Sequence, residues 1–303
     1  MTPHAETATS AESTIAPTGS ACALDEAAMH AFARDAKIGL LATVDADGRP
    51  HITLITSIQA RGPREMMFGQ FTEGLSKAHL KRNPKAGFLI MTPERDIWRG
   101  TVRWTHAVKT GEDYELYNRK PMFRYNAYCG IHTVHHLAPV DLAGRERLSA
   151  ARLAAWTLAL VPGRLMAMRR THVRALNPWT TRHLATVTTL KFASWVAPDG
   201  YPVITPPLAC GAADGGRLVV RPTHDLPADG QTVAVFAINS EMESVLIRGR
   251  CSGWRRHAGL ATGVLDVEWV YNSMPPKQGQ IYPAVPIEPV TIFGAPRIVA
   301  TER

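Results

Sequence analysis

The pair Ser76-Lys77 is the part of the sequence best suited to bind an anion. It lies near the start of the segment from Gly74 to Asn83, which has helical spacing. The first turn of a helix exposes unpaired N–H groups and the positive end of the helix dipole, so a hydroxyl and an ammonium there favour a phosphate or carboxylate. The alternative is an ordinary solvent-exposed face of a short amphipathic helix.

The segment from Tyr117 to His132 gathers aromatic, amide and arginine side chains before a predicted strand. Arg124 and Asn126 are the candidates for binding an anionic or planar substrate, because a guanidinium gives bidentate recognition and stacks on rings. The alternative, which the sequence leaves open, is a loop that its aromatic residues pin to the rim of the fold.

Metal binding is not predicted, although Cys129, His132, His135 and His136 are close in sequence. A strand places residue 135 on the opposite face from residues 132 and 136. No carboxylate accompanies them in the pattern of a catalytic zinc site. Hydrogen-bonded, structural histidines are the expectation.

Composition narrows the class of protein. The chain has 303 residues, 45% hydrophobic and 20% charged, with a net charge of +8. No nucleic-acid-binding module is recognisable. The region 1–21 lacks the pattern of a signal peptide, and the apolar stretch 148–161 is too short to span a bilayer. We therefore expect a cytoplasmic protein with reduced thiols, a small-molecule substrate, and neither nucleic-acid nor membrane partners; a homodimer is a candidate assembly.

A repeated heptapeptide defines the architecture. Residues 47–53 read Asp-Gly-Arg-Pro-His-Ile-Thr, and residues 199–205 read Asp-Gly-Tyr-Pro-Val-Ile-Thr. Each copy follows an apolar run, so each predicts a strand, a tight Asp-Gly turn and a second strand. Ile247-Arg248-Gly249 similarly echoes Trp98-Arg99-Gly100. The chain is therefore expected to contain the same β-unit twice.

The predicted elements favour antiparallel barrels over a parallel sheet. A helix is expected over 24–37 and another over 73–83, the latter with Leu75, His79 and Leu80 inward and Ser76 and Lys77 more exposed. The predicted strands are 38–44, 52–58, 66–71, 86–91, 98–108 and 131–140, and then 192–196, 203–208, 217–220, 232–238, 245–254 and 263–270. The predicted organisation is a tail (1–23), a first barrel (24–142), a helical linker broken at Pro162-Gly163 (143–183) and a second barrel with a proline-rich tail (184–303).

This order of elements resembles the FMN-binding split β-barrel of the pyridoxamine 5′-phosphate oxidase-like superfamily over residues 28–142. The stretch Ser76-Lys77 to Asn83-Pro84 is its most specific part, and the strand with Trp98-Arg99-Gly100 follows. The resemblance implies a mainly β fold with some α, made of two tandem split β-barrels, each six-stranded, antiparallel and Greek-key-like, with the cofactor at their junction.

The resemblance also implies roles for single residues. The phosphate of FMN would be bound by Ser76 and Lys77, and the ring or ribityl chain by His51, Thr53, Gln70 and Thr72. Trp98 and Arg99 match a strand that approaches the flavin from the partner barrel. The second half lacks a Ser-Lys helix, so it is expected to act as the partner of the first.

The function that the resemblance implies is a two-electron redox step by an FMN-dependent oxidoreductase on a small molecule, with NAD(P)H as a candidate electron donor. If the reaction needs a proton donor, Tyr125, Tyr128 and His132 are the candidates by their place in the aromatic segment. Related barrels bind haem or a deazaflavin. The alternatives are a non-catalytic flavin- or haem-binding protein and a haem-degrading enzyme.

Overall fold

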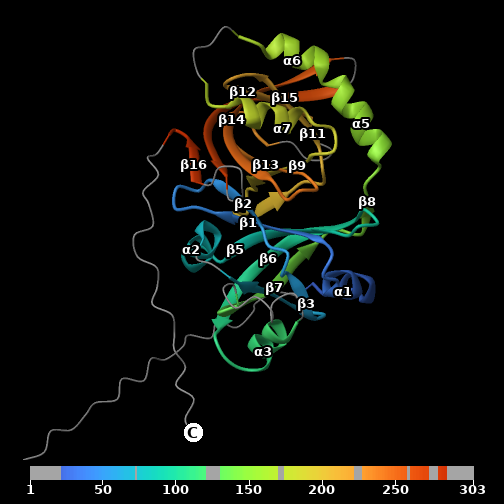
Figure 1. Cartoon of the computed structure of the whole chain (residues 1–303), viewed down its shortest axis with the longest axis vertical. Coiled ribbons are helices and arrows are strands. Elements are labelled where there is room, and N and C mark those ends of the chain that lie inside the picture. Colours follow the sequence, from blue (N-terminus) through green and yellow to red (C-terminus); the bar gives the residue numbers. More distant parts are fainter. Residues whose placement is uncertain are drawn as a thin grey trace, which may run out of the picture.

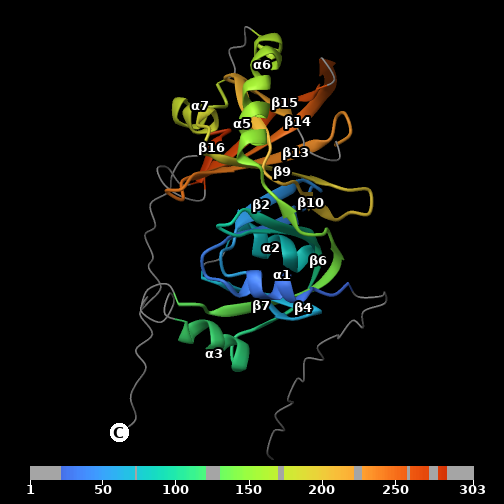
Figure 2. The same ribbon diagram turned by 90° about the vertical axis from the view of Figure 1, so that its right-hand side faces the viewer.

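A computed structural model describes residues 22–71, 74–120, 130–169, 174–221, 227–257, 260–272 and 279–284. Figure 1 shows two β-structures, one above the other, with the helices α5 and α6 along the side of the C-terminal one. Figure 2 shows that the strands β2 and β10 lie near the plane where the two structures meet.

The N-terminal sheet is antiparallel, with the strand order β2-β1-β5-β6-β7-β4-β3 and β8 paired to β6. We call this sheet with its helices the first barrel. Its strands are β1 (Ile38–Val44), β2 (Pro50–Leu54), β3 (Gln59–Gly62), β4 (Glu65–Gln70), β5 (Lys85–Met91), β6 (Asp96–Val108), β7 (Thr133–Leu142) and β8 (Glu146–Arg147).

The C-terminal sheet, the second barrel, repeats this order as β10-β9-β13-β14-β15-β12-β11, with β16 paired to β15. Its strands are β9 (Leu190–Val196), β10 (Pro202–Ile204), β11 (Ala209–Asp214), β12 (Arg217–Arg221), β13 (Thr232–Ile238), β14 (Ser244–His257), β15 (Leu260–Asn272) and β16 (Gly279–Tyr282). The predicted fold class of two tandem barrels is confirmed. Within the described residues each sheet has eight strands, where six were predicted, because short strands join it.

The two Asp-Gly turns form as the repeat predicts. Gly48 and Gly200 have φ values of 77° and 82°, a region that glycine enters without steric cost. The Asp45 carboxylate accepts hydrogen bonds from the backbone N–H groups of Asp47 and Arg49. The Asp199 carboxylate accepts one from the N–H of Tyr201. These local bonds set the register of β1 with β2 and of β9 with β10.

The described helices are α1 (Glu26–Ala33), α2 (Leu75–Arg82), α3 (Glu112–Arg119), α5 (Ala150–Ala159), α6 (Val161–Ala167) and α7 (Pro178–Ala185). The Asp25 carboxylate caps α1 by accepting from the N–H of Ala28, and the Asn177 side chain caps α7 in the same way. The linker is helical as predicted, but its helices break at Leu160 and not at Pro162-Gly163. Pro162 lies in the first turn of α6, where its missing N–H costs nothing. None of the described helices is long and apolar enough to cross a membrane.

The predicted faces of α2 are partly wrong. Ser76 and Lys77 are 1% and 9% exposed, although they were expected to be more exposed, while Leu75 is 43% exposed. Leu80 is buried as expected. Residues 76 and 80 are four apart and share one face of the helix, and it is this face that α2 turns inward. A buried lysine is unusual unless it is paired or serves a ligand.

A shared apolar core joins the two barrels. It includes Leu40 and Leu89 of the first barrel together with Phe192 and Phe236 of the second. The backbones approach closely there, since a Cβ placed on Gly87 would lie 2.1 Å from the carbonyl oxygen of Pro202. The barrels are thus packed together as one unit and are not separated by a loose linker.

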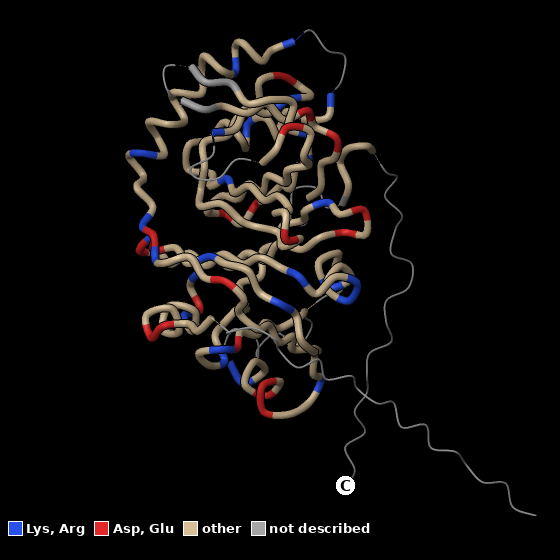
Figure 3. Tube along the Cα trace, turned by 180° about the vertical axis from the view of Figure 1, so that it is seen from behind, with Lys and Arg blue, Asp and Glu red and all other residues tan. Residues whose placement is uncertain are grey.

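Charge is mixed over the surface. Figure 3 shows Lys and Arg interspersed with Asp and Glu along the trace seen from behind, without a continuous basic stripe on that face. The net charge of +8 is therefore spread along the chain.

Candidate functional site at the barrel junction

The start of α2 carries a buried hydroxyl and a buried ammonium group. Gly74, at the N-cap, gives no side-chain hydrogen bond to the helix. The Ser76 hydroxyl oxygen has no hydrogen-bond partner among the described residues. A Cβ on Gly74 would lie 3.6 Å from the Lys77 ammonium, so this ammonium lies against the cap. An uncapped helix start with these two groups suits an anion.

His51 lies at the centre of a cluster to which both barrels contribute. It is 4% exposed on β2, and its ring meets that of His79 of α2 edge-on, with 5.2 Å between centroids. The Thr43 hydroxyl is 3.0 Å from His79 Nδ1. From the second barrel, the rings of Trp269 and Tyr271 lie 6.3 and 6.4 Å from His51.

Arg248 of β14 connects the second barrel to this cluster. Its Nη1 donates a 2.6 Å hydrogen bond to Oδ2 of Asp45, at the β1–β2 turn. Its guanidinium lies 4.0 Å from the centroid of the Trp269 ring, which stacks on Tyr271 with an interplanar angle of 1°. Its Nε is buried without a hydrogen-bond partner among the described residues. The Nε–H of Arg248 is thus a buried donor that, among the described residues, has no acceptor.

Burial keeps the histidines of the cluster neutral. Desolvation lowers the pKa of His51 to about 3, and the neighbouring His79, Arg248 and Lys77 lower it further while Asp45 raises it. Desolvation also lowers the pKa of His79. Near neutral pH both imidazoles therefore offer one N–H donor and one nitrogen lone pair.

The low pKa of His51 predicts acid sensitivity. In the unfolded chain His51 binds a proton below about pH 6.5, whereas in the folded protein it does so only near pH 3. The unfolded state binds more protons between these values, so the free energy of unfolding falls as the pH falls, by roughly 1.4 kcal/mol per pH unit from this group.

Urea unfolding at pH 6.0 and 4.5 measures this effect. His51→Gln removes the titrating group and should lower the pH dependence of unfolding by about 2 kcal/mol over this interval. His30→Gln is the control, since His30 lies on the exposed side of α1. An unchanged pH dependence in His51→Gln would contradict a buried neutral imidazole.

The structure places some of the predicted site residues in this region and others elsewhere. His51, Ser76 and Lys77 belong to the region just described. Thr53 lies on β2, opposite Leu41 of β1, and is partly exposed. Thr72, Arg124, Tyr125, Asn126 and Tyr128 lie outside the described residues, so the structure does not place them.

Gln70 belongs to a separate set of hydrogen-bonded side chains on the first barrel. Its Oε1 is 2.6 Å from His135 Nε2, and the indole N–H of Trp104 donates to His135 Nδ1 over 3.2 Å. Because Nδ1 accepts, Nε2 carries the proton and donates to Gln70. His132 is exposed, with Nδ1 2.8 Å from the Thr133 hydroxyl. The described residues contain no group of three or more His, Cys, Asp or Glu side chains arranged to hold a metal ion.

Trp98 and Arg99 are not brought to the cluster. Trp98 is buried in the core of the first barrel, where its ring meets Phe32 edge-on at 6.1 Å. Arg99 donates a 3.0 Å hydrogen bond to Glu146. The glycines of the two similar tripeptides do have equivalent surroundings. A Cβ on Gly100 would meet the backbone carbonyl of Asp141, and a Cβ on Gly249 would meet that of Asp266.

Sequence reasoning missed several members of the cluster. Asp45 and His79 were not assigned to it, and neither were Trp269 and Tyr271. The alternation Trp269-Val270-Tyr271 was an available signal, since it places two aromatic rings on one face of a strand. The sequence indicated only that Arg248 is similar to Arg99. In the sheets, Arg248 lies opposite Ala234 of β13, and Arg99 lies opposite Leu89 of β5. Its role depends on a contact with Asp45, 203 residues away.

Comparison with known proteins agrees with this fold. Residues 25–144 match the family model described as pyridoxamine 5′-phosphate oxidase. The predicted family resemblance is confirmed. The match covers the first barrel, and no curated protein matches the chain.

Several solved structures are similar to parts of the chain. An FMN-binding protein from Syntrophomonas wolfei is 16% identical, with a TM-score of 0.34, and the match covers 40% of this chain and 85% of that one. An F420 reductase is 19% identical, with a TM-score of 0.32, covering 40% and 98%. A haem-binding protein from Mycobacterium smegmatis is 16% identical, with a TM-score of 0.28, covering 71% and 89%.

Proposed function

We propose that this chain binds FMN at the junction of its barrels and uses it for a two-electron redox step on a small molecule. The observation that supports this proposal is the buried Ser76 hydroxyl, which has no hydrogen-bond partner among the described residues, beside the buried Lys77 at a helix start without a side-chain cap. Burying a hydroxyl without a partner costs free energy, and a phosphate dianion would accept a hydrogen bond from Ser76 while the Lys77 ammonium balances its charge.

The groups that the second barrel contributes to the cluster fit the rest of a flavin. Arg248 Nε is a buried donor that has no partner in the part of the chain that the structure describes, and Trp269 and Tyr271 form a stacked aromatic pair. Donors and aromatic faces are what a polar, planar ring system requires. When bound, FMN supplies the hydride or electron chemistry itself, and the protein orients it and sets its electrostatics. His51 stays neutral in that role, so it hydrogen-bonds without adding a charge.

A haem-binding function is the second candidate. The buried imidazole of His51 and the half-buried imidazole of His79, both with lowered pKa values, meet edge-on, and a neutral imidazole nitrogen is the usual axial ligand of haem iron. The visible spectrum of the purified protein separates the candidates. Flavin bands support the FMN proposal, a Soret band supports haem, and a colourless protein that takes up neither cofactor contradicts both. Reduction of the bound flavin by NAD(P)H in the absence of oxygen would support an enzyme over a carrier.

The assignment of the phosphate is tested with Lys77→Ala. A hydrogen bond to a charged group contributes about 1.5–3 kcal/mol, so FMN should bind roughly 10- to 150-fold more weakly. Lys81→Ala is the matched control, because Lys81 lies on the same helix and is exposed. Fluorescence titration with FMN measures both, and riboflavin, which lacks the phosphate, should bind the parent and Lys77→Ala equally. If Lys77→Ala binds FMN as tightly as Lys81→Ala does, the phosphate lies elsewhere.

A further inference from the structure

A second cavity lies away from the cluster around His51, beside the seam between the barrels. Its volume is about 580 Å³. Its apolar wall comes from three parts of the chain: Ile38 and Met91 from the first barrel, Leu190 from the second, and Leu148 and Leu153 from the linker. Cavities of about 300–1,000 Å³ with mainly apolar walls are typical of small-molecule sites.

This cavity is separate from the proposed flavin site. Ile38, at the first residue of β1, lines the cavity, whereas Val44, at the last, precedes the Asp45 turn of the cluster. A strand rises about 3.3 Å per residue, so these ends are roughly 20 Å apart. A ligand in this cavity would therefore not overlap the proposed flavin site.

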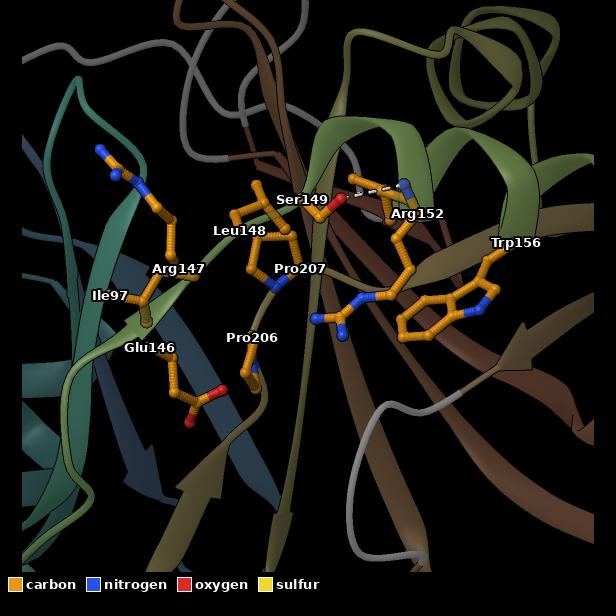
Figure 4. A pocket seen from close by; sticks show the side chains of 10 residues that line it. Ile97, Glu146, Arg147, Leu148, Ser149, Arg152, Trp156, Pro206 and Pro207 are labelled. Atoms are coloured by element: carbon orange, nitrogen blue, oxygen red, sulfur yellow. Dashed lines mark hydrogen bonds between the residues drawn. The ribbon is translucent and has the colours of Figure 1, made fainter.

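The helix α5 forms one wall of the cavity. Its N-terminus is fixed by Ser149, whose hydroxyl accepts a 3.2 Å hydrogen bond from the N–H of Arg152. Figure 4 shows this bond in a neighbouring pocket of about 20 Å³, where Leu148 lies beside Pro207. That pocket is large enough for about one water molecule. Leu148 and Leu153 line both spaces.

The charges around the cavity are positive. Lys37 and Arg95 line it, and none of its described lining residues is acidic. The nearby carboxylates already have cationic partners: Glu94 pairs with Arg34 at 2.6 Å and Asp35 with Lys120 at 3.5 Å. An apolar space with two cations in its wall fits a ligand that has a hydrocarbon body and one negative charge.

We propose that this cavity binds a small apolar monocarboxylate, such as a medium-chain fatty acid. Its hydrocarbon body packs against Leu148, Leu153 and Leu190, and its carboxylate interacts with Lys37 and Arg95. Because the ligand would contact both barrels and the linker at once, its binding stabilises their arrangement.

Isothermal titration calorimetry with sodium decanoate tests the proposal on the full chain, with 1-decanol as the uncharged probe. Ala154→Trp fills the cavity from α5 and should weaken decanoate binding at least tenfold. Ala155→Trp is the control, because Ala155 is exposed and does not line the cavity. Lys37→Met with Arg95→Met should weaken decanoate about tenfold and leave decanol unchanged.

Each outcome of this titration decides the proposal. Decanoate bound equally well by Ala154→Trp and Ala155→Trp would place it elsewhere, and decanol bound as tightly as decanoate by the parent would exclude a role for the cations. If Ala154→Trp does not fold, Val187→Trp fills the cavity from its exposed rim. No decanoate binding by the parent would overturn the proposal. FMN affinity should stay constant throughout, so failure here is separate from failure of the flavin proposal.

Discussion

Gly87→Ala is expected to cost about 3 kcal/mol of unfolding free energy, at the upper end of what an added methyl costs in a packed interior. The new Cβ would lie 2.1 Å from the carbonyl oxygen and 3.1 Å from the carbonyl carbon of Pro202. Both atoms are backbone, on a strand that β9 holds in register, so neither can rotate away. The barrels would have to move apart, which exposes part of the shared core. Urea unfolding and the melting temperature measure the loss.

Gly62→Ala is the matched control for this substitution. Gly62 also lies in a strand of the first barrel, and a Cβ there would meet nothing within 4 Å. It should change stability by less than about 0.5 kcal/mol, as exposed substitutions usually do. Equal stability of the two variants would mean that the barrels do not approach as closely as the structure shows.

Arg248→Ala should cost about 1.5–3 kcal/mol, because it removes a charged hydrogen bond from Asp45, although Asp45 keeps a second cation, Arg49, at 3.7 Å. The side chains of Arg248 and Asp45 are only 10% and 15% exposed. The substitution also removes the cation from the Trp269 ring. Because the pair joins a turn of the first barrel to a strand of the second, the loss should appear as weaker association of the barrels.

A double-mutant cycle with Asp45→Asn isolates this pair. Asparagine keeps the side-chain oxygen that accepts from the N–H groups of Asp47 and Arg49, so the turn is preserved. The double variant should be more stable than the sum of the single losses predicts, by about 1–3 kcal/mol. Arg250→Ala is the control, since its side chain is 58% exposed in its pair with Glu268. Additive losses at Arg248 and Asp45 would refute a coupled pair.

The fold was predictable where local sequence determines it. The Asp-Gly turns at 47–48 and 199–200 each define a hairpin, because glycine alone enters positive φ without cost and the preceding aspartate closes the turn. The longer strands between them alternate or run apolar, so their positions along the chain could be predicted, whereas the short strands that extend each sheet to eight could not. The repeat then made the second sheet a copy of the first.

The site was less predictable, because its contacts are distant in sequence. The inward face of α2 was misjudged: hydropathy favours Leu75 inward, yet Ser76 and Lys77 are buried. Hydropathy cannot anticipate a buried polar pair that a ligand would satisfy. The contact of Arg248 with Asp45 spans 203 residues and depends on how two finished barrels dock. No window of the sequence contains that information.

The covalent link between the barrels sets how the site responds to dilution. The cluster takes Asp45 and His51 from one barrel and Arg248 and Trp269 from the other. In a dimer of separate subunits, such a site would come apart as the protein is diluted below its dissociation constant. Here the helical segment between β8 and β9 tethers the halves, so their association is intramolecular and does not depend on protein concentration. The cluster therefore stays assembled in a single molecule.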